Sequence, residues 1–229
     1  MIPCLLLRNT GLVKTIKFKD PTYLGDPRNI VKIFNDKDAD ELALLDITAT
    51  VENRGPRFDL IEEISTECFM PMGYGGGVRH TEQVKRIVSI GIEKVIINTA
   101  AVEVPRLVTD ASRIVGSQSV VVSIDVKKAG LFSTKHEVFT HGGRKATGLN
   151  PVDFARRMEQ EGAGEIILNS IDQDGTMKGY DVAITKAVAE AVNIPVVACG
   201  GAGSVGDFVK VVREGGASAV AAGSFFVFQ

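Results

Sequence analysis

An internal repeat spans half of this sequence and constrains the fold more than any other feature. When the chain is shifted by 125 residues without a gap, glycines of the two halves coincide: Gly75, Gly76 and Gly91 fall on Gly200, Gly201 and Gly216. Under the same shift, Asn98-Thr99 falls on Gly223-Ser224. The repeat predicts two similar halves, about residues 1–116 and 117–229, within one domain over residues 1–229.

Each copy of the repeat contains a short apolar segment that ends in glycine, at YGGG (74–77) and CGGAG (199–203). Glycine lets an anion approach the backbone N–H groups closely, and the start of a following helix adds partial positive charge. The repeat therefore predicts two phosphate-binding turns. The alternative is that these glycines only form tight turns between strands and helices.

Apolar strand-like segments alternate with amphipathic helix-like segments along the whole chain. Eight strands and seven helices are expected, including strands at 2–7, 41–47 and 120–125 and helices at 58–68 and 104–115. Strict alternation over 229 residues favours a closed (βα)8 barrel, the α/β TIM-barrel architecture, over an open sheet. The final helix of such a barrel is expected to be missing, because only residues 225–229 follow the last strand.

Composition excludes several classes of function. The net charge is −2 and the basic residues are scattered, so nucleic acid is not an expected partner. No apolar segment approaches the length of a membrane span and no signal peptide is recognisable, which predicts a cytoplasmic protein without a membrane partner. Cys4, Cys68 and Cys199 lack the spacing of a metal site or a disulfide framework, and neither a metal nor a cofactor is expected.

In a barrel of this type the active site lies at the C-terminal ends of the strands. Polar residues at the predicted strand ends are therefore the candidates: Lys14, Asp46, Asn98, Thr99, Asp125, Asn169, Ser170, Asp172, Asp174 and Ser224, with 75–77 and 199–201. Lys14 is expected in the loop after the first strand. The glycine-rich, basic segment THGGRKATG (140–148) follows Asp125 and predicts a lid over an anionic substrate; a solvated hairpin over 131–140 is the alternative.

Six segments together resemble the cyclase subunit of imidazole glycerol phosphate synthase, the HisF-like family. They are LLDITA (44–49), GYGGGVR (73–79), INTAAV (97–102), THGGRKATG (140–148), SIDQDGTMKGYD (170–181) and ACGGAG (198–203). The resemblance implies a (βα)8 barrel that receives ammonia from a glutaminase subunit. It also implies a small-molecule substrate with a phosphate at each end, from which imidazole glycerol phosphate and an aminoimidazole ribotide are released.

The resemblance assigns roles to individual residues. It implies substrate or phosphate contacts at Cys4, Lys14, Gly76, Gly77, Asn98, Thr99, Asn169, Asp174, Gly175, Gly200, Gly201 and Ser224, and a catalytic role for Asp125. It also implies a ring of charged residues, Glu41, Lys94 and Glu165, that admits ammonia at the opposite face of the barrel. A purely structural layer of salt bridges is the alternative for this ring. A fourth member of the family's ring, an arginine, would precede Met1.

The sequence departs from the family at one catalytic position. The family uses two aspartates as general acid and base, and Leu6 stands where the first is expected. We weigh three interpretations: a histidine-pathway cyclase in which Asp46 or a water replaces the lost carboxylate, a paralogue that passes ammonia to a sugar amidotransferase of surface polysaccharide synthesis, and a non-catalytic phosphate-binding scaffold. The paralogue is favoured, because LLLRNTGLVKT (5–15) resembles the segment of paralogues that are found with such amidotransferases, in which a cyclisation residue would be free to change.

Overall fold

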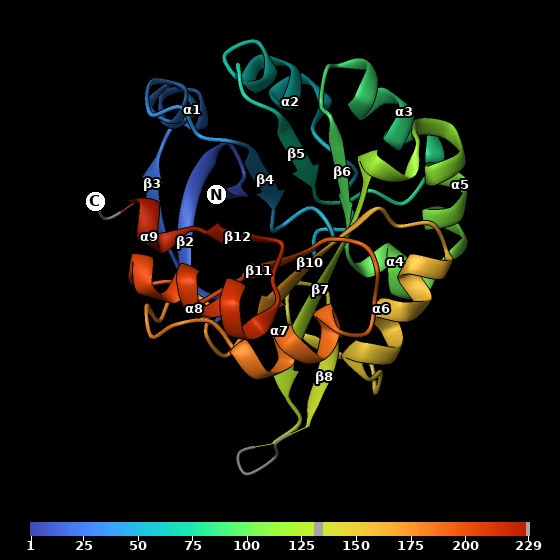
Figure 1. Cartoon of the computed structure of the whole chain (residues 1–229). Helices are drawn as coiled ribbons and strands as arrows, with labels where there is room; N and C mark the ends of the chain where they lie inside the picture. Colours follow the sequence, from blue (N-terminus) through green and yellow to red (C-terminus); the bar gives the residue numbers. More distant parts are fainter. Residues whose placement is uncertain (131–134, 228–229) are drawn as a thin grey trace.

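Eight parallel strands close into a barrel in the computed structural model, which describes residues 1–130 and 135–227 (Figure 1). The barrel strands are β1 (Ile2–Arg8), β4 (Leu42–Asp46), β5 (Met72–Gly75), β6 (Lys94–Ile97), β7 (Val120–Lys128), β10 (Glu165–Ser170), β11 (Val196–Cys199) and β12 (Ala219–Ala222). Pairing of β12 with β1, and of β10 with β7, completes the ring. The predicted (βα)8 architecture is confirmed.

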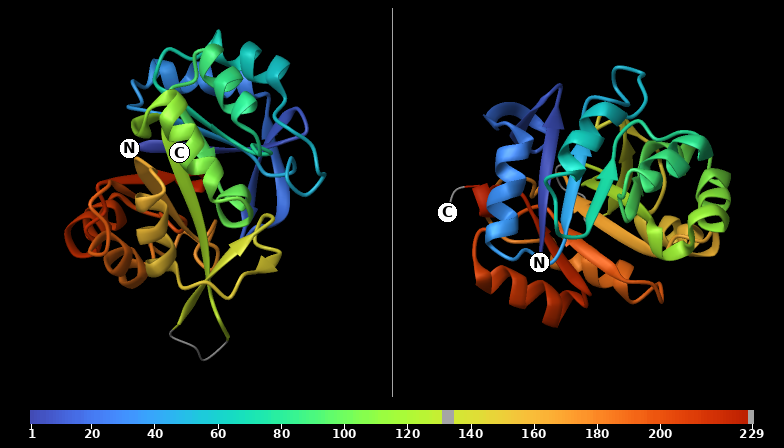
Figure 2. Two further views of the ribbon diagram at one scale, coloured as in Figure 1. Left: turned by 90° about the vertical axis from the view of Figure 1, so that its right-hand side faces the viewer. Right: turned by 90° about the horizontal axis from the view of Figure 1, so that it is seen from above.

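Helices surround the strands on the outside of the barrel (Figure 2). They are α1 (Pro27–Asp36), α2 (Phe58–Ser65), α3 (Thr81–Ser89), α4 (Thr99–Glu103), α5 (Arg106–Val115), α6 (Pro151–Gln160), α7 (Val182–Ala189), α8 (Val205–Gly215) and α9 (Ser224–Val227). The helix predicted at 104–115 is α5, which begins at Arg106 after Pro105, and the short helix α4 that precedes it was not expected. Where no helix was expected after the last strand, the chain forms the single turn of α9. No helix within the described ranges is long and apolar enough to cross a membrane.

An antiparallel hairpin extends the first strand of each half. In the first half, β2 (Gly11–Ile16) pairs with β1 and with β3 (Lys19–Gly25). In the second half, β8 (His136–Thr140) pairs with β7 and with β9 (Lys145–Ala146). The hairpin predicted as an alternative over 131–140 is present in its C-terminal part, while residues 131–134 lie outside the described residues.

The β2–β3 hairpin corrects one prediction. Lys14 lies in β2 and pairs with Thr22 of β3, not in a loop. Lys17 and Phe18 connect the two strands with φ of 54° and 62°, the left-handed pair that a tight two-residue hairpin requires. Sequence patterning missed β3 because residues 19–23 are all exposed, so the strand has no apolar alternation.

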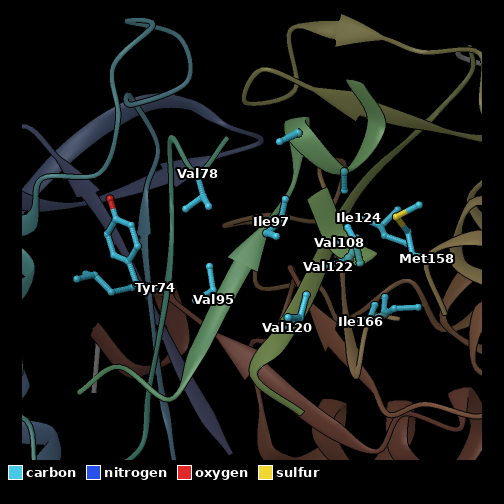
Figure 3. Packing of buried hydrophobic residues seen from close by; sticks show 14 of the residues in the cluster. Tyr74, Val78, Val95, Ile97, Val108, Val120, Val122, Ile124, Met158 and Ile166 are labelled. Atoms are coloured by element: carbon cyan, nitrogen blue, oxygen red, sulfur yellow. The ribbon is translucent and has the colours of Figure 1, made fainter. Parts of the chain in front are cut away.

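Alternating side chains of the strands divide the core into two layers. The larger layer lies between strands and helices and includes Tyr74, Ile97, Val122 and Met158 (Figure 3). A smaller layer fills the inside of the barrel with Ile2, Cys4, Ala43, Ile96, Val121, Ile167, Val197, Cys199 and Ala221. Strand β7 is buried on both faces, as expected for a barrel strand. The inward-facing side chains at its C-terminal end open into the site described next.

Candidate functional site

A cavity of about 730 Å³ occupies the C-terminal ends of the barrel strands. It is lined by every residue to which the resemblance assigned catalysis or substrate contact: Cys4, Lys14, Gly76, Gly77, Asn98, Thr99, Asp125, Asn169, Asp174, Gly175, Gly200, Gly201 and Ser224. Ser170 and Asp172, which were also candidates as strand-end residues, do not line it. The two glycine turns, which the repeat places half a chain apart, therefore face the same cavity. Which ligand these residues bind remains a prediction.

The first glycine turn, 75–77, rests on the loop that follows β4. Gly76 has a φ of 132°, and a Cβ added there would lie 2.6 Å from both the Cβ and the carbonyl oxygen of Asp46. A Cβ added at Gly77 would lie 2.5 Å from the carbonyl oxygen of Arg54. Only glycine fits this turn, which brings its backbone to the edge of the cavity.

The second glycine turn, 200–201, packs on the backbone of Ser170 and Gly179 and on the side chains of Asn169 and Gln173. Gly201 has a φ of 109°, and a Cβ there would collide with the carbonyl oxygen of Gly179. The Gly179 N–H donates a 2.7 Å hydrogen bond to the carbonyl oxygen of Gly201. The two turns thus have similar backbone shapes but different supports.

Asp125 lies at the centre of the site with its carboxyl group buried. Its side chain accepts a 3.2 Å hydrogen bond from Asn98 and is also hydrogen-bonded to Asn169. Burial, assisted by the nearby charge of Asp174, raises the pKa of Asp125 to about 7 against these hydrogen bonds. A carboxyl group with such a pKa can both hold and release a proton near neutral pH.

No proton-transfer group faces Asp125 from the equivalent position of the first half. Leu6 lies on β1, lines the same cavity and pairs with Leu45 of β4. In the second half, the equivalent strand pair is Asp125 of β7 with Asn169 of β10. The floor of the cavity is therefore apolar on one side and polar on the other.

The carboxylate of Asp46, which the sequence suggested as a substitute for the missing one, already has hydrogen-bond and ionic partners. Its Oδ1 accepts hydrogen bonds from the backbone N–H groups of Thr48 and Ala49, both at 3.1 Å, and from Arg54 Nη2 at 2.9 Å. Arg54 Nη1 lies 2.8 Å from the second oxygen in an ionic contact. The guanidinium and the loop hold the Asp46 carboxylate in place, which disfavours it as a mobile general base.

Each hairpin contacts a predicted phosphate-binding residue of the opposite half. Asp174 of the second half accepts hydrogen bonds from the Thr15 hydroxyl at 2.8 Å and the Phe18 N–H at 3.2 Å, both in the β2–β3 hairpin. Thr99 of the first half accepts a 3.0 Å hydrogen bond from the N–H of His141, which follows β8. The predicted lid segment also reaches the rim of the cavity, where 142–144 line it.

Sequence reasoning missed Arg54 and the hairpin residues Thr15 and Phe18, and it named His141 only as part of the predicted lid segment 140–148. Their contacts join positions far apart in the chain, such as Thr15 and Asp174, and no local sequence motif predicts such contacts. The one available signal was the placement of a hairpin-forming segment after the first strand of each half.

The predicted charged ring assembles at the opposite end of the barrel. Lys94 Nζ donates hydrogen bonds to Glu41 at 2.8 Å and to Glu165 at 2.9 Å. Burial raises the pKa of Glu165 although Lys94 opposes it. Burial also acts to lower the pKa of Lys94, but its hydrogen bonds to Glu41 and Glu165 raise it on balance. The arrangement fits both an entrance for a small molecule and a structural salt-bridge layer.

Cys4 and Cys199 line the lower part of the cavity as free, buried cysteines. The pKa of Cys199 is raised well above its usual value, first by its hydrogen bond with the Cys4 thiol and then by burial. A raised pKa keeps this group a neutral thiol and therefore a poor nucleophile.

Comparison with known proteins gives a match over the whole chain. The family model described as "Histidine biosynthesis protein" matches residues 1–229. A protein of Pseudomonas aeruginosa with the provisional name imidazole glycerol phosphate synthase subunit hisF2 is 50% identical over all of this chain and 90% of its own length. The imidazole glycerol phosphate synthase subunits HisF of Hyphomonas neptunium and Alkaliphilus metalliredigens are 49% and 47% identical, over all of this chain and 89% and 90% of their own lengths.

Proposed function

The chain belongs to the histidine biosynthesis protein family as a HisF-like cyclase subunit of imidazole glycerol phosphate synthase, and we propose that it is a paralogue specialised in delivering ammonia. In this proposal the barrel docks a glutaminase subunit, conducts ammonia along its axis, and binds a ligand with two phosphate groups at its mouth. The ammonia then passes to a separate enzyme, for which we propose a sugar amidotransferase.

The observation that carries this proposal is the apolar pair Leu6–Leu45 opposite Asp125 and Asn169. Ring closure and elimination in the family are attributed to two aspartates, and leucine neither accepts nor donates a proton. Losing one general acid–base group costs roughly 10²- to 10⁴-fold in rate. Because Asp46 is held by Arg54 and its own loop, it offers no ready replacement.

The inside of the barrel supports a path for ammonia. Between the Glu41–Lys94–Glu165 ring and the cavity lie small or apolar side chains such as Ala43, Val197 and Ala221. Entry of a charged ammonium ion into such surroundings costs far more free energy than entry of neutral ammonia. The relatives are named as subunits of a synthase, which supports a partner that supplies the ammonia.

The first experiment measures cyclisation of the bis-phosphate ribulosyl substrate with ammonium salt as the nitrogen source. We expect the wild-type chain to be slow and Leu6→Asp to be faster by about tenfold or more, since it restores the acid–base pair. Leu45→Asp is the matched control: it adds a carboxylate to the same cavity, on the adjacent strand, and should not raise the rate. Wild-type turnover as fast as that of the named HisF relatives would instead make this chain an authentic cyclase.

That alternative, a histidine-pathway cyclase, is favoured by one observation: Asp125 keeps a pKa of about 7, which suits a proton-transfer group. The third interpretation, a non-catalytic scaffold, is tested with a glutaminase subunit. We expect the barrel to bind it and to stimulate its glutamine hydrolysis. If no glutaminase binds and ammonia transfer is undetectable while phosphate still binds, the scaffold interpretation replaces ours.

A further inference from the structure

A buried ion pair supports the first glycine turn but not the second. The Asp46 side chain is fully buried at 0% exposure, and its partner Arg54 is 26% exposed. Asp46 lines the cavity, whereas Arg54 lies behind it and reaches the site only through Asp46 and the loop 47–54. The Arg54 guanidinium also donates a 2.8 Å hydrogen bond to the Thr48 hydroxyl, which ties both ends of this loop together.

The glycine turn is pressed directly onto these two residues. The Gly76 backbone packs on Asp46 and the Gly77 backbone packs on the carbonyl of Arg54, with no room for a Cβ at either glycine. Any shift of the loop would therefore displace the turn and the direction of its N–H groups. Since hydrogen bonds to an anion depend on distance and angle, the ion pair controls how well this turn can bind one.

The second half has no such ion pair at the equivalent position. The residue equivalent to Asp46 is Ser170, the last residue of β10, as Asp46 is of β4. A Cβ added at Gly200 would lie 2.7 Å from the Ser170 carbonyl oxygen, and Gly201 is held by its backbone contact with Gly179. The second turn therefore keeps its shape without an ion pair behind it.

We propose that Arg54 is a positioning residue for anion binding: through Asp46 it holds the 75–77 turn in the geometry that binds one phosphate group of the ligand. The second phosphate turn does not depend on it. This inference rests on the proposed function in that it assumes phosphate binding at both turns.

The test follows binding of inorganic phosphate at each turn separately, through the backbone amide NMR signals of Gly76 and Gly77 and of Gly200 and Gly201. We expect Arg54→Gln to weaken phosphate binding at the first turn by about tenfold and to leave the second within about twofold. Arg54→Lys keeps the charge without the two-point pairing, and should weaken the first turn by about threefold. Arg28→Gln is the matched control: it removes an exposed arginine–aspartate pair in the same half, with Asp26, and should change neither turn.

The outcomes separate this inference from the proposed function. Unchanged phosphate binding at the first turn of Arg54→Gln, or an equal loss at both turns, would overturn the role of Arg54 while the proposed function stands. Absence of phosphate binding at both turns of the wild-type chain would overturn the proposed ligand, and this inference with it. If Arg54→Gln does not fold, the test uses Arg54→Lys alone. Phosphate binding at the first turn of Arg54→Lys as tight as in the wild-type chain would then contradict the proposal.

Discussion

The two halves of this barrel share a backbone but differ in chemistry at their strand ends. At the ends of β1 and β4 the cavity is lined by Leu6 and Leu45; at the ends of β7 and β10 it is lined by Asp125 and Asn169. The glycine turns remain in both halves, at Gly76 and Gly201, with positive φ angles of 132° and 109°. Backbone geometry was thus kept while the side chains facing the cavity diverged.

The supports beneath the turns show the same division. The first turn rests on the Asp46–Arg54 ion pair and the second on the backbone of Gly179. At the other end of the barrel, Glu41 and Glu165 occupy corresponding positions and are bridged by Lys94 of the first half; under the 125-residue shift the counterpart of Lys94 is Ala219. The comparison teaches that a duplicated scaffold can keep two glycine turns at one mouth while only the second half keeps a carboxyl group at the end of its first strand.

Removing the bridging cation should have the largest effect. Lys94→Met leaves Glu41 and Glu165 close together without a positive charge, and we expect it to lower the free energy of unfolding by about 2 to 4 kcal/mol, allowing for partial exposure of the cluster. Urea denaturation measures this. The control Lys32→Met removes an exposed pair with Glu67 and should cost less than about 1 kcal/mol. Equal losses in the two variants would mean that the ring contributes no more than a surface pair.

Asp125 should make the stability of the second half depend on pH. Because its pKa is about 7 in the folded state and lower in the unfolded chain, the folded state binds the proton more tightly. Its contribution to stability is therefore present at about pH 4 and is lost as the pH rises through about 7. Asp125→Asn should remove this dependence and be the more stable form at pH 8, by an amount on the order of 4 kcal/mol at most.

The measurement compares unfolding free energies of wild type and Asp125→Asn between pH 4 and pH 8. Leu6→Asn is the matched control, because it changes the corresponding residue of the first half without altering a titratable group. The same pH slope in wild type and Asp125→Asn would show that the buried carboxyl does not titrate in this range.

The crosswise hairpin contacts should give the smallest effects. Thr15→Val removes a hydrogen bond to the Asp174 carboxylate and should cost about 1.5 kcal/mol; Thr99→Val removes the acceptor of a neutral bond from His141 and should cost about 1 kcal/mol. Amide hydrogen exchange of Phe18 and of His141 reports on the two hairpins separately. We expect Thr15→Val to speed amide exchange only at Phe18, and Thr99→Val to speed it only at His141. Loosening of both hairpins by either change would show that the halves are coupled across the mouth.

Much of the architecture followed from local features of the sequence. Alternating apolar patterns predicted the barrel, and the duplicated glycines predicted two turns at one mouth, since strand ends of a parallel barrel share one face. The positions of Glu41 and Glu165 at strand starts likewise predicted their meeting at the other face. The expected loop at Lys14 was wrong, because the exposed strand β3 carries no periodic pattern.

The sequence by itself determined the duplicated barrel, the two glycine turns and the absence of a carboxylate at Leu6, because strand periodicity, backbone sterics and residue identity are local properties. Only the tertiary structure decided that Arg54 forms an ion pair with Asp46, that each hairpin contacts the opposite half, and that burial raises the pKa of Asp125. These depend on contacts between distant residues and on how completely packing excludes water, and neither is encoded at any single position in the chain.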